Sequence, residues 1–541
     1  MKHRKWLIIS AGLGLILLAG WLFWQRPERV EMANYAPAET LLYLEVNDLP
    51  VLLETLTQTA AWQDLAPAYG LDKNYADSSA GWLTRLLASV NLGSTRTVVL
   101  TRAQVAVALL RISATDAGES LKIRPQFVVI IETKSNRAET FAANEIGDLA
   151  RRQFGAVRTE ARTGDGATWT IFHSVADERD IFAAVAGTTV FVGNDETAVA
   201  ACLDVRNGKR PSLAPDENLV KMRANTESQA ALAFGYISSE GIKQLSTVGA
   251  VLFAGQISDD PRAMSLLAQS LPPFVQKSVT AVGWTARASQ NGQIEDRYLV
   301  QMPADLIARL REPLAIGSQT PSQIGNYLPK QVDSVTVYNF KNPGEAWRGT
   351  VLALTTKLDA FSAAAFSQTA NNLLAPYGVK NAHEFLRAAT GEIATAQLKT
   401  VDGAQKMAII SPADAETIQK NLTAPPRVIG DKILFGDESA IDKGVHEQQQ
   451  QPPETLGQTA QWQKFNAPPE SAFVRTLASD DESPPKFVAL FSRQRDVRLT
   501  DEPGAWRWTT SETRLVREGF ERRVFSSFGL IGTLATRFAE K

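Results

Sequence analysis

The chain has only one cysteine among its 541 residues, so no intrachain disulfide can hold the fold together. This single cysteine, Cys202, also excludes a structural zinc site with two or more cysteine ligands. An excess of basic residues is missing too, because 56 lysines and arginines face 58 aspartates and glutamates, for a net charge of −2. We therefore expect no nucleic-acid partner, since this balance leaves no surplus cations to neutralise a phosphate backbone.

Catalytic motifs are missing as well. The sequence contains no G-x-S-x-G element, which excludes a nucleophile elbow of that type, and no H-E-x-x-H metal motif. The four histidines, at His3, His173, His383 and His446, show no ligand spacing. The sequence therefore predicts no catalytic, metal-binding or cofactor-binding residue and no cofactor. A serine hydrolase with a different arrangement of residues stays open.

One long hydrophobic run is present, at the N-terminus. The basic segment MKHRK precedes an uncharged run from Trp6 to Trp24. At ~1.5 Å per residue, these roughly 19 residues span about 28 Å, close to the hydrocarbon core of a bilayer. We predict a transmembrane signal anchor over 6–24 that contacts the lipid bilayer. Residues 1–5 then lie in the cytoplasm and the rest of the chain outside it, because basic residues favour the cytoplasmic side.

Two other interpretations of this run stay open: a cleaved signal peptide, or a helix buried in a soluble fold. A cleaved signal has a shorter apolar core followed by small residues. Here the run continues through the bulky GWLFWQR, and no A-x-A element follows closely. The sequence therefore favours an uncleaved anchor.

The chain also contains an internal repeat. Residues 190–237 and 433–480 align without a gap, so that VFVGNDETAVAACLD faces ILFGDESAIDKGVHE and Gly193 matches Gly436. Leu213 likewise matches Leu456. Similar segments recur outside this block in the same order. A recurrence on this scale indicates duplication of a whole folding unit.

The repeat sets the predicted domain boundaries. A juxtamembrane segment over 25–36 leads into a first repeat over 37–315, and a linker over 316–325 leads into a second repeat over 326–541. The first copy carries extra residues at about 241–275, which we expect to form an added helix.

The predicted fold class is α+β, with two tandem divergent repeats of mostly antiparallel sheets and packed helices. QVAVALLRI and PQFVVIIETK are β-branched apolar runs of strand length. Two segments predict hairpins, one with a turn at Asn291-Gly292 and one at Glu518-Gly519. Hairpins require antiparallel pairing, which favours α+β over a doubly wound α/β fold. A helix is expected to end at Gly155, and another to begin after Asn47 or Asp48.

The acidic turns Asp195-Glu196 and Asp437-Glu438 begin a helix after a strand, where carboxylates cap free N–H groups. A phosphate site is disfavoured there, because the acids repel phosphate and no P-loop lysine follows. Cys202 lies opposite Val445 of the second copy, which favours a buried packing cysteine over a reactive thiol.

Two further segments have alternative interpretations. The acidic cluster SDDES, Ser479 to Ser483, lacks the spacing of a calcium-binding EF-hand and is better explained as a solvated loop. The apolar segment from Phe528 to Ala539 could dock on a membrane, but we expect it to pack against its own sheet.

The N-terminal anchor, PAETLLYLEVNDLP just after it, the VFVGNDETAV turn and the VGWTARASQNGQIEDRYLV hairpin together carry a resemblance. They resemble a bacterial domain-of-unknown-function family whose members are single-pass proteins with an extracytoplasmic duplicated domain. The resemblance covers nearly the whole chain, and its motifs are structural. It implies location and architecture, and no reaction, cofactor or ligand.

These observations favour a binding or scaffolding protein of the cell envelope, anchored in the bacterial cytoplasmic (inner) membrane. The absence of a concentrated catalytic constellation favours a non-enzymatic role. An envelope hydrolase with an unrecognised site, or an assembly factor for a membrane complex, stays open. By analogy with other duplicated proteins, the cleft between the copies is the expected place for a ligand.

Overall fold

The structure is a computed structural model. The chain divides into two compact units. Its described residues are 29–73, 95, 99, 103–116, 121–257, 261–317, 320–400, 403–467, 472–492, 497 and 504–539. The first unit takes Met1–Gln58 and Asp72–Tyr236 of the chain, and the second takes Thr59–Leu71 and Ile237–Lys541. This division is based on contacts in space and does not coincide with the predicted linker over 316–325. The linker was inferred from the repeat in the sequence, and it stays a prediction.

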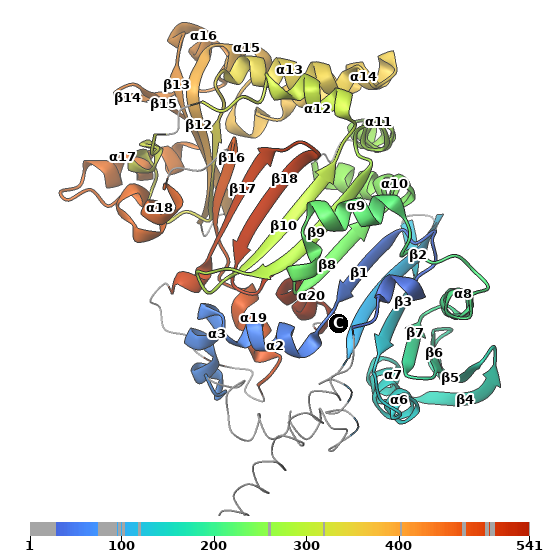
Figure 1. Cartoon of the computed structure of the whole chain (residues 1–541). Helices are drawn as coiled ribbons and strands as arrows, with labels where there is room; N and C mark the ends of the chain where they lie inside the picture. Colours follow the sequence, from blue (N-terminus) through green and yellow to red (C-terminus); the bar gives the residue numbers. More distant parts are fainter. Residues whose placement is uncertain are drawn as a thin grey trace, which may run out of the picture. The chain divides into compact units, whose positions relative to one another are not determined.

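The first unit is built on an antiparallel sheet. Its strands are β1 (Leu42–Val46), β2 (Gln104–Asp116), β3 (Leu121–Glu132), β4 (Val157–Gly164), β5 (Ala167–Ser174), β6 (Asp180–Ala186), β7 (Thr189–Gly193) and β8 (Ala233–Ile237). They lie in the order β8–β1–β2–β3–β7–β6–β5–β4, and every pair from β1 to β4 is antiparallel (Figure 1). In four of these pairs, β2–β3, β4–β5, β5–β6 and β6–β7, the two strands follow each other directly in the sequence, and a short connection between neighbouring strands favours antiparallel pairing.

Short helices join the strands of the first unit. They are η1 (Met32–Tyr35), α2 (Leu49–Thr57), α6 (Ala138–Phe141), the π-helical η3 (Ala142–Ile146), α7 (Gly147–Phe154), α8 (Glu196–Arg206), α9 (Glu217–Asn225) and η4 (Ser228–Ala230). Asp48 caps α2 by accepting a hydrogen bond from the Val51 N–H. Gly155, at φ 73°, follows the last residue of α7. Both helix boundaries agree with the sequence-based prediction.

The second unit contains a longer antiparallel sheet. Its strands are β9 (Ala281–Ala288), β10 (Ile294–Gln301), β11 (Ser334–Asn339), β12 (Ala389–Thr400), β13 (Gly403–Pro412), β14 (Arg427–Ile429), β15 (Lys432–Gly436), β16 (Val474–Ser479), β17 (Trp508–Leu515) and β18 (Gly519–Ser526). They lie in the order β9–β10–β18–β17–β16–β11–β12–β13–β15–β14. Both predicted hairpins, β9–β10 and β17–β18, are present. The α+β class is thus confirmed.

Helices also connect the strands of the second unit. They are α3 (Ala60–Leu65), η2 (Ala66–Tyr69), α10 (Ser239–Ile257), α11 (Pro261–Ser278), α12 (Ala304–Arg311), η5 (Ile324–Tyr327), α13 (Pro343–Thr355), α14 (Ala360–Asn372), η6 (Ala375–Tyr377), α15 (Ala382–Arg387), α16 (Ala415–Lys420), α17 (Glu438–Gln449), η7 (Leu456–Gln458), α18 (Ala460–Phe465), α19 (Ser483–Ala489), η8 (Ala505–Arg507) and α20 (Gly529–Ala539). Where one added helix is expected at about 241–275, the structure has the pair α10 and α11.

Strands β11, β12 and β13 are packed on both faces. On β11, Val335 and Val337 are buried in a core cluster that also contains Trp462 of α18 and Ile441 of α17. Tyr338, the next residue of β11, packs instead against a second cluster that holds residues of α15. Successive side chains of a strand point to opposite faces. One face is therefore covered by α17 and α18, and the other by α13 and α15, where the site described below lies (Figure 1).

The order of strand pairings in β1–β2–β3–β7–β6 recurs in β11–β12–β13–β15–β14. A helix follows in each case, α8 after β7 and α17 after β15, and β8 lies beside β1 as β16 lies beside β11. Gly193, opposite Val128, ends β7, and Gly436, opposite Met407, ends β15.

No helix in the described part of the chain is long and apolar enough to cross a membrane. The predicted anchor over 6–24 lies outside the described residues. Of the predicted linker over 316–325, Ile316 forms a bridge with Phe340 and Ile324 is buried.

Candidate functional site

The three histidines within the described residues, His173, His383 and His446, do not converge on a site. His173 lies in β5, with its Nδ1 2.9 Å from Asp180 Oδ1 and its Nε2 3.7 Å from Glu160 Oε2. His383 lies in the first turn of α15 and His446 in α17. Across the described ranges, no group of three or more histidine, cysteine, aspartate or glutamate side chains could hold a metal ion.

The acidic turns have structural partners. Asp195 caps α8, and its carboxylate accepts hydrogen bonds from the Ala198 N–H at 3.0 Å and from Gln126 Nε2 at 3.1 Å. Asp437 precedes α17 but, contrary to the prediction, makes no capping hydrogen bond to this helix. Its carboxylate is turned to the neighbouring strand, where it accepts a hydrogen bond from the Lys406 N–H at 2.7 Å. A Cβ at Gly193 would lie 2.8 Å from the Phe127 carbonyl, so the neighbouring strand leaves no room for a side chain there. These contacts explain the recurring glycine and acids without a ligand.

Cys202 is 0% exposed in α8, and burial raises the pKa of its thiol to about 12. The thiol therefore stays protonated and unreactive at neutral pH. In the SDDES cluster, Asp480 accepts a hydrogen bond from the Ser483 N–H, at the start of α19. Phe528 precedes α20 and is buried, and the centroids of its ring and the Phe487 ring are 4.3 Å apart.

The most distinctive feature of the second unit is a cavity of about 560 Å³. It lies where α13, η6 and α15 cover β11, β12, β13 and β15, and we call it the apolar cavity. Aromatic side chains form much of its wall, among them Trp347, Phe385, Phe435, Phe473 and Phe520. The Phe385 and Phe435 rings are 5.1 Å apart, as are edge-to-face pairs in protein cores. Leu373 lines the cavity and is 54% exposed, so the cavity reaches the surface near the end of α14.

The polar groups of the apolar cavity are uncharged. Tyr338, Tyr377, Thr350 and Thr395 line it, and no aspartate, glutamate, histidine, lysine, arginine, serine or cysteine is among the described residues of its wall. The Thr350 hydroxyl is buried without a hydrogen-bond partner among the described residues. Burial raises the pKa of Tyr377, and a hydrogen bond with Thr395 partly offsets this effect. The cavity is thus suited to holding an apolar group, and the described residues of its wall carry no charged side chain.

A second hollow, of about 350 Å³, adjoins the apolar cavity. Leu314 and Phe473 line both spaces. Its remaining wall comes from the end of α12 and from the β17–β18 turn and carries two cations, Arg311 and Arg517. Both arginines are exposed, and no described residue forms an ion pair or hydrogen bond with either guanidinium. We call this space the arginine hollow.

A polar hollow of about 230 Å³ contains residues of both predicted copies, with Asn291 and Gln293 from the first and Lys464, Arg475 and Glu512 from the second. The Arg475 guanidinium lies over the Phe465 ring at 4.4 Å and donates a hydrogen bond to the Phe465 carbonyl. Burial lowers the pKa of Arg475. This arginine has partners within the fold, which explains its position without a ligand.

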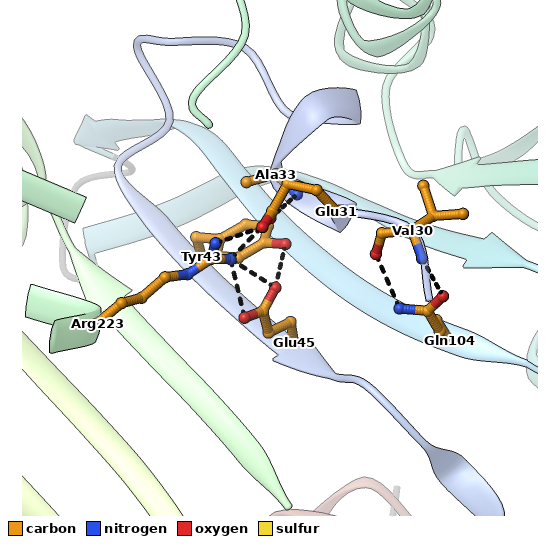
Figure 2. Close-up of polar contacts among 7 residues, drawn as sticks. All are labelled: Val30, Glu31, Ala33, Tyr43, Glu45, Gln104 and Arg223. Carbon is orange, nitrogen blue, oxygen red and sulfur yellow. Dashed lines mark hydrogen bonds and ion pairs between the residues drawn. The ribbon is translucent and has the colours of Figure 1, made fainter. Parts of the chain in front are cut away.

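The first unit contains a buried charged cluster, shown in Figure 2. Arg223 of α9 binds Glu31 with Nη1 at 2.6 Å and Glu45 of β1 with Nη2 at 2.8 Å, and the Tyr43 hydroxyl donates to Glu45 at 2.8 Å. Burial raises the pKa of Glu45 although the Arg223 charge opposes this. Beside the cluster, Gln104 exchanges two hydrogen bonds with the Val30 backbone. These contacts hold residues 30–33 against β1 and β2, which is a structural role.

The apolar cavity was missed from the sequence. Trp347, Phe385 and Phe473 have the spacing and composition of ordinary core residues, and only their packing reveals the space between them. The described residues singled out from the sequence lie elsewhere, in turns, helices and the core. No family model, curated protein or solved structure gives a significant match to the chain, so the resemblance to a family stays a prediction.

Proposed function

We propose that the protein is a membrane-anchored, extracytoplasmic binding protein of the bacterial envelope that holds a hydrophobic ligand in the apolar cavity. The observation that carries this proposal is the cavity, about 560 Å³ of space with a wall of apolar and aromatic side chains. Ligand pockets usually measure roughly 300–1,000 Å³ and have such walls. Protein interiors leave few voids larger than a water molecule, so a space of this size favours an occupant.

The envelope location rests on the sequence. The basic N-terminus and the uncharged run over 6–24 support an anchor, and a protein held beside a bilayer has apolar ligands close at hand. The duplication over 37–315 and 326–541 is supported by the strand pairings that recur in the same order around β1 and β11. In this proposal the apolar cavity belongs to the second copy, with Leu314 contributed by the first.

The test is to reduce the cavity and measure binding. Ala346 is a buried residue of α13 that lines the cavity, and Ala346→Trp would fill part of the space. Ala364 is an exposed residue of the neighbouring helix α14, so Ala364→Trp is the matched control. Binding of a long-chain alcohol such as dodecanol is measured by calorimetry, and circular dichroism checks that both variants are folded.

We expect Ala346→Trp to weaken dodecanol binding by about tenfold or more, which corresponds to ~1.4 kcal/mol, while Ala364→Trp binds as the unaltered protein does. The proposal fails if the unaltered protein does not bind dodecanol, or if a folded Ala346→Trp variant binds it with unchanged affinity.

A further inference from the structure

We propose that the ligand is an amphiphile with an anionic head, a carboxylate or a phosphate, whose chain lies in the apolar cavity and whose head binds Arg311 and Arg517. This inference rests on the proposed function and adds the chemical class of the ligand.

The first step is that the two spaces adjoin. Leu314 and Phe473 form part of the wall of the apolar cavity and part of the wall of the arginine hollow. Both side chains are buried, and they pack in one cluster with Phe340 and Phe520. In the proposal, the ligand extends past these apolar side chains from a space without charged side chains among its described residues to a space with two cations.

The second step is electrostatic. A charged head cannot lie within the apolar cavity at low cost, because the described side chains of its wall offer only uncharged polar groups, the tyrosine and threonine hydroxyls and the Trp347 indole N–H. The arginine hollow provides two guanidinium groups that no described residue pairs, and its wall, as far as the structure describes it, contains no acidic residue. Guanidinium groups bind carboxylates and phosphates through parallel, charge-assisted hydrogen bonds. The charge of the hollow therefore selects an anion over a neutral or cationic head.

The third step is that the fold fixes the backbone at both arginines. Arg311 is the last residue of α12, whose Leu306, Ile307 and Leu310 are buried. Arg517 lies in the tight β17–β18 turn, where the Val516 N–H donates to the Gly519 carbonyl at 2.8 Å. The Glu518 carbonyl also accepts a hydrogen bond from the Met302 N–H at 3.0 Å. The backbone thus places both arginines at the wall of the arginine hollow before a ligand arrives.

The experiment compares four ligands of equal chain length below their micelle-forming concentrations: laurate, dodecyl phosphate, dodecanol and dodecyltrimethylammonium. Each is titrated calorimetrically into the unaltered protein and into the double variant Arg311→Ala/Arg517→Ala. The control variant is Lys330→Ala/Arg427→Ala, which removes the same charge from two exposed positions outside both spaces. The pH is slightly alkaline so that laurate is ionised.

We expect the unaltered protein and the control variant to bind laurate and dodecyl phosphate about tenfold or more tightly than dodecanol, and to bind the cation most weakly. The arginine double variant should lose this preference and keep its affinity for dodecanol. Equal affinity of the unaltered protein for laurate and dodecanol would overturn the inference and leave the proposed function standing. A preference for anions that survives in the arginine double variant would also overturn it. If none of the four ligands binds, both proposals fail.

Discussion

At the scale of single residues, Asp296 has an unusual environment for a carboxylate. It is 2% exposed, and it accepts hydrogen bonds from Trp284 Nε1 at 2.9 Å and from the Leu530 N–H at 2.8 Å. Burial raises the pKa of Asp296 from 3.8 to about 6, although both hydrogen bonds act to lower it. Between about pH 4 and pH 6, the folded protein therefore binds a proton at Asp296 that the unfolded chain has released. The contribution of Asp296 to stability is fully present below about pH 4 and is lost as the pH rises through about 6.

The variant Asp296→Asn measures this contribution, because asparagine does not titrate. We expect the unfolding free energy of the unaltered protein, relative to that of Asp296→Asn, to fall by on the order of 2 kcal/mol between about pH 4 and pH 8. Urea unfolding of both proteins at each pH gives the difference and cancels the titration of every other group. A difference that stays constant, or rises with pH, would contradict the raised pKa.

At the scale of elements, Arg223 attaches the short helix η1 and the chain before it to β1. Removing Arg223 leaves the side chain of Glu45, which is 4% exposed, without its cation. We expect Arg223→Ala to lower the unfolding free energy by on the order of 3 kcal/mol. Arg223→Lys should lower the unfolding free energy by less, because lysine keeps the positive charge and loses only the bidentate hydrogen bonding of the guanidinium. Urea unfolding measures both, and equal stability of all three proteins would show that the cluster contributes nothing.

Local elements could be predicted from the sequence because each depends on a few consecutive residues. Asp48 caps α2, Gly155 follows α7, and Asn291-Gly292 turns the β9–β10 hairpin, as their side-chain chemistry requires. The pairing of β10 with β18 was not predictable, because Arg297 and Glu521, which meet there, are 224 positions apart. The apolar cavity was hidden for a related reason, since its wall is assembled from strands and helices spread over residues 314–520.

At the scale of the second unit as a whole, Glu521 joins the two hairpins. Its carboxylate is fully buried and accepts hydrogen bonds from Arg297 Nε at 2.6 Å, Arg514 Nε at 2.7 Å and Arg523 Nε at 3.0 Å. Burial acts to raise the pKa of Glu521, but the charges of the three arginines outweigh it, and the pKa lies below 4.5.

We expect Glu521→Gln to cost on the order of 3 kcal/mol of unfolding free energy at neutral pH, because three partly buried arginines lose their counter-charge. Since the folded pKa is lowered, the contribution of Glu521 is present above about pH 4.5 and is lost as the pH falls below it. The difference between the two proteins in urea unfolding should therefore shrink in acid. A difference that grows as the pH falls would contradict this assignment.

At the scale of the whole chain, the last prediction concerns whether residues 6–24 anchor the protein in a membrane, as the sequence predicts. If residues 6–24 are an uncleaved anchor, the full chain should sediment with membranes, resist extraction by alkaline carbonate and retain its N-terminal methionine-containing peptide in mass spectrometry. A chain lacking residues 1–28 should leave the membrane fraction, because the predicted anchor over 6–24 is removed. A C-terminal alkaline phosphatase fusion should be active, since the enzyme folds only outside the cytoplasm. A soluble product that begins after residue 24 would identify a cleaved signal instead, whereas an inactive fusion on a membrane-bound chain would reverse the predicted orientation.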